Sequence, residues 1–146
     1  MFVSFAITQP VIMVTMILGL GMAAIFLWRW RSLSAKRLYL EQCDVALAYP
    51  QFSNPESQLD MRSRTHKAGD YAFEQYEWYV ARLVYVLDEC LALMPFSRWS
   101  YVADTQLGNH RQYFASDYYA KQSYLPHYSA RMQQLIAQQR EESGHG

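Results

Sequence analysis

Charged side chains are absent from the first 28 residues of this 146-residue chain, and the first one is Arg29. A cleaved secretory signal has a positively charged stretch before a short apolar core and small residues at the cleavage site. Here the apolar run is longer than such a core, and the basic residues follow it. The first small-x-small tripeptide after the apolar run, Ser32-Leu33-Ser34, lies beyond those basic residues. We therefore expect the N-terminal segment to be retained as an anchor.

Cysteines and clustered metal ligands are scarce. Cys43 and Cys90 are the two cysteines and form no CxxC motif, which excludes a zinc ribbon and favours free, buried thiols. Neither H-E-x-x-H nor paired E-x-x-H motifs occur. Glu74 and Glu77 could approach His110 of the next helix, but two carboxylates and one imidazole fall short of a di-iron ligand set. The sequence predicts no metal and no cofactor.

Catalytic motifs are also missing, since the chain has no glycine-rich phosphate loop and no G-x-S-x-G elbow. Cys90 could be paired with a histidine from another helix, but a buried structural thiol is inert. The 13 basic and 13 acidic residues balance, so the basic excess typical of a nucleic-acid-binding protein is absent. No enzymatic activity is predicted and no nucleic-acid partner is expected, although an enzyme is not excluded.

An uncharged, apolar run extends from Pro10 to Trp28. A bilayer core takes about 20 helical residues to cross, so this run predicts one transmembrane helix. Indole rings favour the membrane interface and basic residues favour the cytoplasmic side, which makes Trp28, Arg29, Trp30 and Arg31 the interface residues. We expect a single-pass protein of the inner (plasma) membrane, with the N-terminus outside and the C-terminal domain cytoplasmic.

Small residues recur at every fourth position of this run, at Thr15, Gly19 and Ala23. Such spacing places them on one thin face of a helix, where another membrane helix can approach closely. The pattern predicts helix packing in the membrane. Because glycine and alanine are common in membrane helices, a plain anchor remains the alternative.

The rest of the chain predicts an all-α protein: one transmembrane helix followed by a small cytoplasmic helical bundle. No segment alternates apolar and polar residues as strands do. The expected parts are listed by residue number: anchor 1–31, juxtamembrane helix 32–49, helical domain 50–140 and flexible tail 141–146.

The clearest helix of the bundle is expected between Gly69 and Pro95. Its apolar residues recur at spacings of three and four, which is the period of a buried helical face. These residues are Phe73, Tyr76, Val80, Leu83, Val84, Leu87, Leu91 and Met94. The opposite face carries several acidic side chains, so this helix should form the middle of the bundle.

Local signals predict the remaining helix starts. Asn54 before Pro55 is typical of a helix N-terminus, as are Ser97, Ser116 with Asp117, and Pro126. The basic cluster at 62–67 is interpreted as a solvated helical face, with contact to acidic lipid headgroups as the alternative.

All 12 tyrosines lie at position 39 or later, and several leave the expected apolar faces. Tyrosine combines a large apolar ring with a polar hydroxyl and is enriched at protein interfaces. The candidate partner surface consists of Tyr79, Tyr85, Tyr118 and Tyr119. The alternative is that these aromatics fill the core of a small domain.

These features favour an accessory, assembly or interaction subunit of a membrane protein complex, acting through its helical cytoplasmic domain. The expected partners are the lipid bilayer and another membrane protein or a second copy of the chain. A membrane-tethered sensor, regulator or defence effector is the alternative, with a ligand pocket among Trp99, His110 and the Glu74 and Glu77 face. A membrane-associated enzyme is the third hypothesis.

Overall fold

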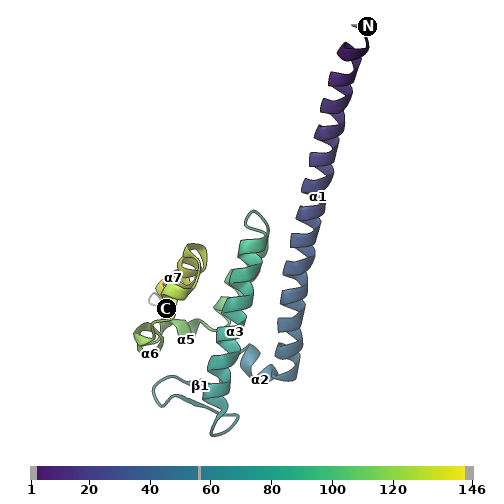
Figure 1. Cartoon of the computed structure of the whole chain (residues 1–146). Helices are drawn as coiled ribbons and strands as arrows, with labels where there is room; N and C mark the ends of the chain where they lie inside the picture. The colour runs from purple at the N-terminus through teal and green to yellow at the C-terminus, as the bar shows by residue number, and fades with distance from the viewer. Residues whose placement is uncertain (1–2, 56, 144–146) are drawn as a thin grey trace. The chain divides into compact units, whose positions relative to one another are not determined.

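The protein consists mainly of helices, as Figure 1 shows for the computed structural model. The structure describes residues 3–55 and 57–143. The chain divides into two compact units, one up to Ser34 and one from Ala35 onward. The all-α prediction holds for the main elements and misses one short β-hairpin. Residues 144–146 of the expected tail lie outside the described residues.

Helix α1 (Val3–Ala48) begins in the first unit and carries the long apolar run. Every side chain from Val11 to Trp30 is exposed, so the apolar surface surrounds the helix. Thr15 Oγ1 donates to the carbonyl oxygens of Val11 and Ile12, at 3.0 and 2.9 Å. This hydroxyl therefore finds its partners within the helix itself. Helix α1 is long and apolar enough to cross a membrane.

The last part of α1 belongs to the second unit, where it packs on helix α3 (Ala72–Leu93). Ala35 is buried with Val86 and Cys90, and Cys90 Sγ donates to the carbonyl oxygen of Ala35 at 3.2 Å. Because alanine has so small a side chain, the two helices approach closely at this point. The expectation of free thiols agrees with the structure, in which Cys43 and Cys90 are both unbridged.

Helix α2 (Pro50–Ser53) follows after one residue, and a hairpin comes next instead of the helix expected at Asn54. Strand β1 (Leu59–Asp60) pairs antiparallel with strand β2 (Thr65–His66). Leu59 lies opposite His66, and both side chains are buried. The helix prediction was therefore wrong, because two-residue strands are too short to show an alternating pattern in the sequence.

The turn between these strands is made by side chains that favour turns. Asp60 Oδ1 accepts a hydrogen bond from the backbone N–H of Arg62 at 2.9 Å, which competes with helical pairing. Arg64 has φ of 54°, in the left-handed region. The basic residues of this segment therefore belong to a loop and hairpin, and the predicted helical face does not form.

Helix α3 confirms the amphipathic helix predicted between Gly69 and Pro95. All but the last member of the predicted apolar stripe are buried: Phe73, Tyr76, Val80, Leu83, Val84, Leu87 and Leu91. Met94, the last member, is half-buried and follows the end of the helix. Pro95 comes next and cannot continue a helical hydrogen-bond ladder.

Shorter helices complete the second unit. They are α4 (Trp99–Gly108), α5 (Arg111–Ala115), α6 (Asp117–Lys121), the 3-10 helix η1 (Leu125–His127) and α7 (Ala130–Ser143). Ser116 caps α6 as predicted, because its Oγ accepts from the N–H of Tyr119 at 3.1 Å. Pro126 lies within η1 and does not start the last long helix. The last long helix begins later, where Ser129 Oγ accepts from the N–H of Met132.

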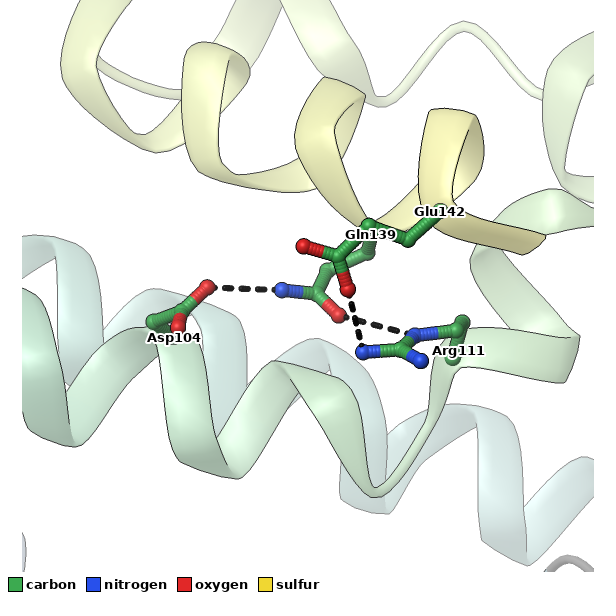
Figure 2. A network of polar contacts seen from close by, with 4 residues as sticks. All are labelled: Asp104, Arg111, Gln139 and Glu142. Carbon is green, nitrogen blue, oxygen red and sulfur yellow. Dashed lines mark hydrogen bonds and ion pairs between the residues drawn. The ribbon is translucent and has the colours of Figure 1, made fainter. Parts of the chain in front are cut away.

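A polar network joins α7 to α4 and α5 (Figure 2). The buried amide of Gln139 donates from Nε2 to Asp104 Oδ1 at 2.7 Å and accepts from Arg111 Nε at 3.2 Å. Arg111 Nη2 also forms an ion pair with Glu142 Oε2 at 2.6 Å. Gln139 is only 1% exposed, so these bonds replace the water that its amide gives up on folding.

Candidate functional site

The four tyrosines of the predicted partner surface do not share one surface. Tyr79 is 6% exposed and Tyr119 is 3% exposed, so both belong to the core and their assignment to the surface was wrong. Phe52 of α2 packs against Tyr79, so the buried face of α3 extends beyond the predicted apolar stripe. Tyr118 is half-buried and Tyr85 is exposed.

A different pair of aromatics is exposed on α3. Trp78 is 72% exposed and Tyr85 is 62% exposed. Residues seven apart lie on the same side of an α-helix, about 10 Å apart along its axis. Ala81 lies between them and is also exposed. We call Trp78, Ala81 and Tyr85 the Trp78 face. Trp78 was not among the predicted surface residues, although its position opposite the apolar stripe of α3 indicates exposure.

Next to this face lies a pocket of about 270 Å³. Helix α3 forms one side of it, and the segment from α5 to the residue after η1 forms the other. The lining residues are Glu74, Glu77, Trp78, Val80, Ala81, Val84, Tyr113, Phe114, Tyr119, Tyr124 and Tyr128. We call this site the tyrosine pocket. Its volume is close to the lower end of small-molecule sites, and its walls are mostly apolar and aromatic.

The carboxylate of Glu77 is held in place by the hydroxyl of Tyr113. Tyr113 Oη donates to Glu77 Oε1 at 3.1 Å. Burial raises the pKa of the Tyr113 hydroxyl, and the neighbouring Glu77 carboxylate raises it further. Burial also raises the pKa of Tyr118, with a further contribution from the neighbouring Glu77 carboxylate. Both hydroxyls therefore stay protonated at neutral pH, and that of Tyr113 remains a donor to Glu77.

The hydroxyl of Tyr119 is buried in the wall of the pocket and has no hydrogen-bond partner among the described residues. Its ring is fixed by edge contact with Phe114, at 5.1 Å between ring centres, and by a tilted contact with Tyr113 at 5.2 Å. Burial raises the pKa of Tyr119, and this effect outweighs the lowering by Arg140. An unpaired buried hydroxyl costs about 1–3 kcal/mol, and this one is a local cost to stability because it has almost no surface that a molecule in the pocket could reach.

The pocket predicted among Trp99, His110 and the two glutamates does not form. His110 is buried next to Tyr76 and is not part of the lining of the tyrosine pocket. Trp99 packs edge-on against Tyr39, with 5.3 Å between ring centres. Across residues 3–55 and 57–143 no group of three or more His, Cys, Asp or Glu side chains could hold a metal ion.

The residues predicted to lie in the membrane or at its interface are on α1, within the first unit. Thr15, Gly19 and Ala23 are exposed, and a methyl group added at Gly19 would meet no atom within 4 Å. Trp28, Arg29, Trp30 and Arg31 are exposed as well. Close helix packing at Thr15, Gly19 and Ala23 stays a prediction. The same holds for contacts of the Trp28–Arg31 segment with the membrane interface.

Together these elements define a helical domain on a chain whose N-terminal helix could cross a membrane. Comparisons with protein-family models, curated proteins and solved structures gave no match for this chain.

Proposed function

We propose that this protein is a single-pass protein of the inner (plasma) membrane and an interaction subunit of a membrane protein complex. The observation that carries the proposal is the Trp78 face, where two large aromatic side chains lie exposed on one side of α3. Tryptophan and tyrosine dominate the energetic centres of protein interfaces. A helix that exposes both of them two turns apart favours a docking role.

The proposed orientation places the N-terminus outside and the helical domain in the cytoplasm. Its support is the distribution of charge around the apolar part of α1. No charged side chain precedes this part, whereas Arg29, Arg31, Lys36 and Arg37 follow it. Basic residues close to the end of a membrane helix favour the cytoplasmic side.

The proposed partner is the basic cytoplasmic segment of another membrane protein. Helix α3 contains four acidic residues, Glu74, Glu77, Asp88 and Glu89, and one basic residue, Arg82. Cytoplasmic loops of membrane proteins are rich in lysine and arginine, so their charge complements this helix. The anionic inner leaflet would be repelled by the same acids, which favours a protein over a lipid surface.

The proposal is tested by site-specific photo-crosslinking of the full-length protein in its native membrane. A benzophenone amino acid replaces Tyr85 in one variant and Tyr101 in a matched control. Tyr101 is also exposed, at 75% against 62% for Tyr85, but lies on α4 and not on the Trp78 face. We expect the probe at Tyr85 to capture a peptide from a basic cytoplasmic loop, and the probe at Tyr101 to capture none.

A second variant tests whether the Trp78 face is the cause of the crosslink to the partner peptide. Trp78→Ala in the Tyr85 probe protein should abolish the crosslink while leaving the melting temperature close to that of the parent, since the side chain is mostly exposed. Crosslinks to lipid alone, or a protein crosslink that persists after Trp78→Ala, would overturn the proposal.

A further inference from the structure

We propose that the turn between α3 and α4 is a second membrane contact, at which the side chain of Phe96 inserts into the interface of an anionic lipid bilayer. This turn comprises residues 94–98, and we call it the Phe96 turn. The contact rests on the proposed membrane helix of α1 and goes beyond it, because it brings the second unit against the bilayer. Three features carry it: the place of the turn in the unit, its exposed aromatic tip and its paired backbone.

The Phe96 turn lies at the end of the second unit where α1 enters it. Helix α3 runs antiparallel to the last part of α1, as two contacts show. Arg82 Nε donates to Gln42 Oε1 at 3.1 Å. About two turns later along α3, Cys90 Sγ donates to the carbonyl oxygen of Ala35 at 3.2 Å. Ala35 is the first residue of the second unit, and α3 ends three residues after Cys90, so the turn follows directly at this end.

The membrane helix tethers the bilayer close to this end of the unit. Arg31, the last of the residues predicted to lie at the membrane interface, precedes Ala35 by four positions in the same helix. Four residues of α-helix measure about 6 Å, which is close to the thickness of one polar headgroup layer. An anchored protein therefore holds the Phe96 turn near the bilayer surface.

Phe96 is presented at the tip of the turn. The backbone N–H of Ser97 donates to the carbonyl oxygen of Met94 at 3.2 Å. This bond closes a four-residue turn with Pro95 and Phe96 at its centre. Phe96 is fully exposed, more than any other large apolar side chain in the described part of the second unit. Insertion at the boundary of headgroups and acyl chains would remove from water a ring that the domain itself leaves uncovered.

The base of the turn is fixed by the core. Met94 and Trp99 flank the turn and pack against the buried cluster of Ala35, Val86 and Cys90. Insertion would therefore order little of the chain, and a contact that needs little ordering loses less of its binding free energy.

Backbone carbonyl groups of the turn are paired within the protein. The carbonyl oxygen of Met94 also accepts from Ser97 Oγ at 2.7 Å. Pro95 has no N–H, and its carbonyl oxygen accepts from Arg131 Nη1. Unpaired backbone groups are costly in an apolar layer, so these pairings suit the tip to insertion.

The charge around the turn favours an anionic surface. Arg98 of the turn is exposed, and Arg131, which approaches it from α7, is exposed as well. Between Glu89 and Asp104 the chain contains no acidic residue. Basic side chains close to anionic lipids strengthen membrane binding. The acids in the first two turns of α3, which disfavour lipid on the rest of that helix, lie at its opposite end.

The test is photo-crosslinking of the full-length protein in vesicles of phosphatidylcholine and phosphatidylglycerol, and then in native membranes. A benzophenone amino acid replaces Phe96 in one variant, so the tip keeps an aromatic side chain. In the matched control it replaces Tyr71, which is 77% exposed and precedes α3 at its other end. We expect lipid adducts from the probe at Phe96, detected by mass spectrometry, and none from the probe at Tyr71.

Two charge variants of the Phe96 probe protein test the lipid preference. Arg98→Gln should lower the yield of lipid adduct about fivefold in the mixed vesicles and leave it unchanged in vesicles of phosphatidylcholine alone. Lys67→Gln removes the same charge from an exposed residue next to β2 and should give the yield of the parent in both.

Any of three results would overturn the proposed contact. They are equal yields of lipid adduct from the probes at Phe96 and Tyr71, a protein adduct in place of lipid at Phe96 in native membranes, and an unchanged yield for Arg98→Gln in the mixed vesicles.

Carbonate extraction of the same vesicles separates this failure from that of the membrane helix. A protein that resists extraction but forms no lipid adduct at Phe96 contradicts the Phe96 turn alone. A protein that carbonate releases contradicts the membrane helix and the turn together. The crosslink at Tyr85 tests the Trp78 face independently of both.

Discussion

Tyr76 Oη and His110 Nδ1 lie 3.0 Å apart in the core of the helical domain. Both side chains are fully buried, and their rings also contact each other, with 5.7 Å between centres. This hydrogen bond joins α3 to the residue that precedes α5. It places a titratable group where water does not reach.

Acid should therefore destabilise the domain. Burial lowers the pKa of His110 from 6.5 to about 4, so the folded protein keeps this imidazole neutral where the unfolded chain protonates it. Stability is complete above pH 6.5 and falls as the pH drops toward about 4. The loss from this one group is about 3 kcal/mol. Burial lowers the pKa of His66 too, which acts in the same direction.

Urea unfolding near neutral pH and at about pH 4.5 measures this loss. His110→Gln keeps a polar group facing Tyr76 but cannot titrate, so its stability should fall less with acid than that of the parent. An equal fall in both proteins would contradict the assignment of acid sensitivity to His110.

Leu87 provides a test of the core. Its side chain is fully buried in the middle of α3, so Leu87→Ala should cost about 2–5 kcal/mol through the cavity it leaves. Glu89→Ala, two residues further along on the exposed side, should change stability by less than about 0.5 kcal/mol. Thermal unfolding of both variants gives the comparison, and the reverse order would mean that α3 faces the other way.

Gly19 tests whether the apolar part of α1 does more than anchor the protein. If Thr15, Gly19 and Ala23 pack against another membrane helix, Gly19→Ile should separate the two backbones and weaken association. Ile17→Leu conserves volume and should be tolerated. Crosslinking in native membranes measures association. Equal association of both variants would make the helix a plain anchor.

The orientation is tested by labelling from outside the cell. With Cys43 and Cys90 replaced by alanine, a cysteine introduced as Ser4→Cys should react with a membrane-impermeant maleimide in intact cells. A cysteine introduced as Ser143→Cys should react only after the membrane is opened. Labelling of Ser143→Cys alone in intact cells would reverse the proposed orientation.

The parts of the fold that the sequence predicted are the ones with long, regular patterns. Helix α3 was found because its apolar residues repeat over six turns, and α1 because its apolar run is uninterrupted. The cap at Ser116 was found because its side chain acts locally, on Tyr119 three residues later. In each case the signal lies within the element itself.

The parts that were missed depend on contacts between distant residues. Tyr79 is buried by Phe52 of another helix, and nothing in its own neighbourhood indicates this contact. The Tyr119 hydroxyl is buried and unpaired because of how α6 packs among its neighbours, and the sequence near Tyr119 does not indicate this packing. The network through Gln139 joins residues 28 and 35 positions apart in the chain.

Trp78 borders two hollows at once. It lines the tyrosine pocket, and it also lines a second hollow with Val45, Tyr49 and Phe52. Once Trp28, Trp30 and Trp99 are replaced by phenylalanine, its indole is the remaining tryptophan fluorophore, placed at the boundary between the two hollows. Any molecule that settles on either side shields the same ring from a soluble quencher such as acrylamide, so one optical signal reports occupancy of both hollows.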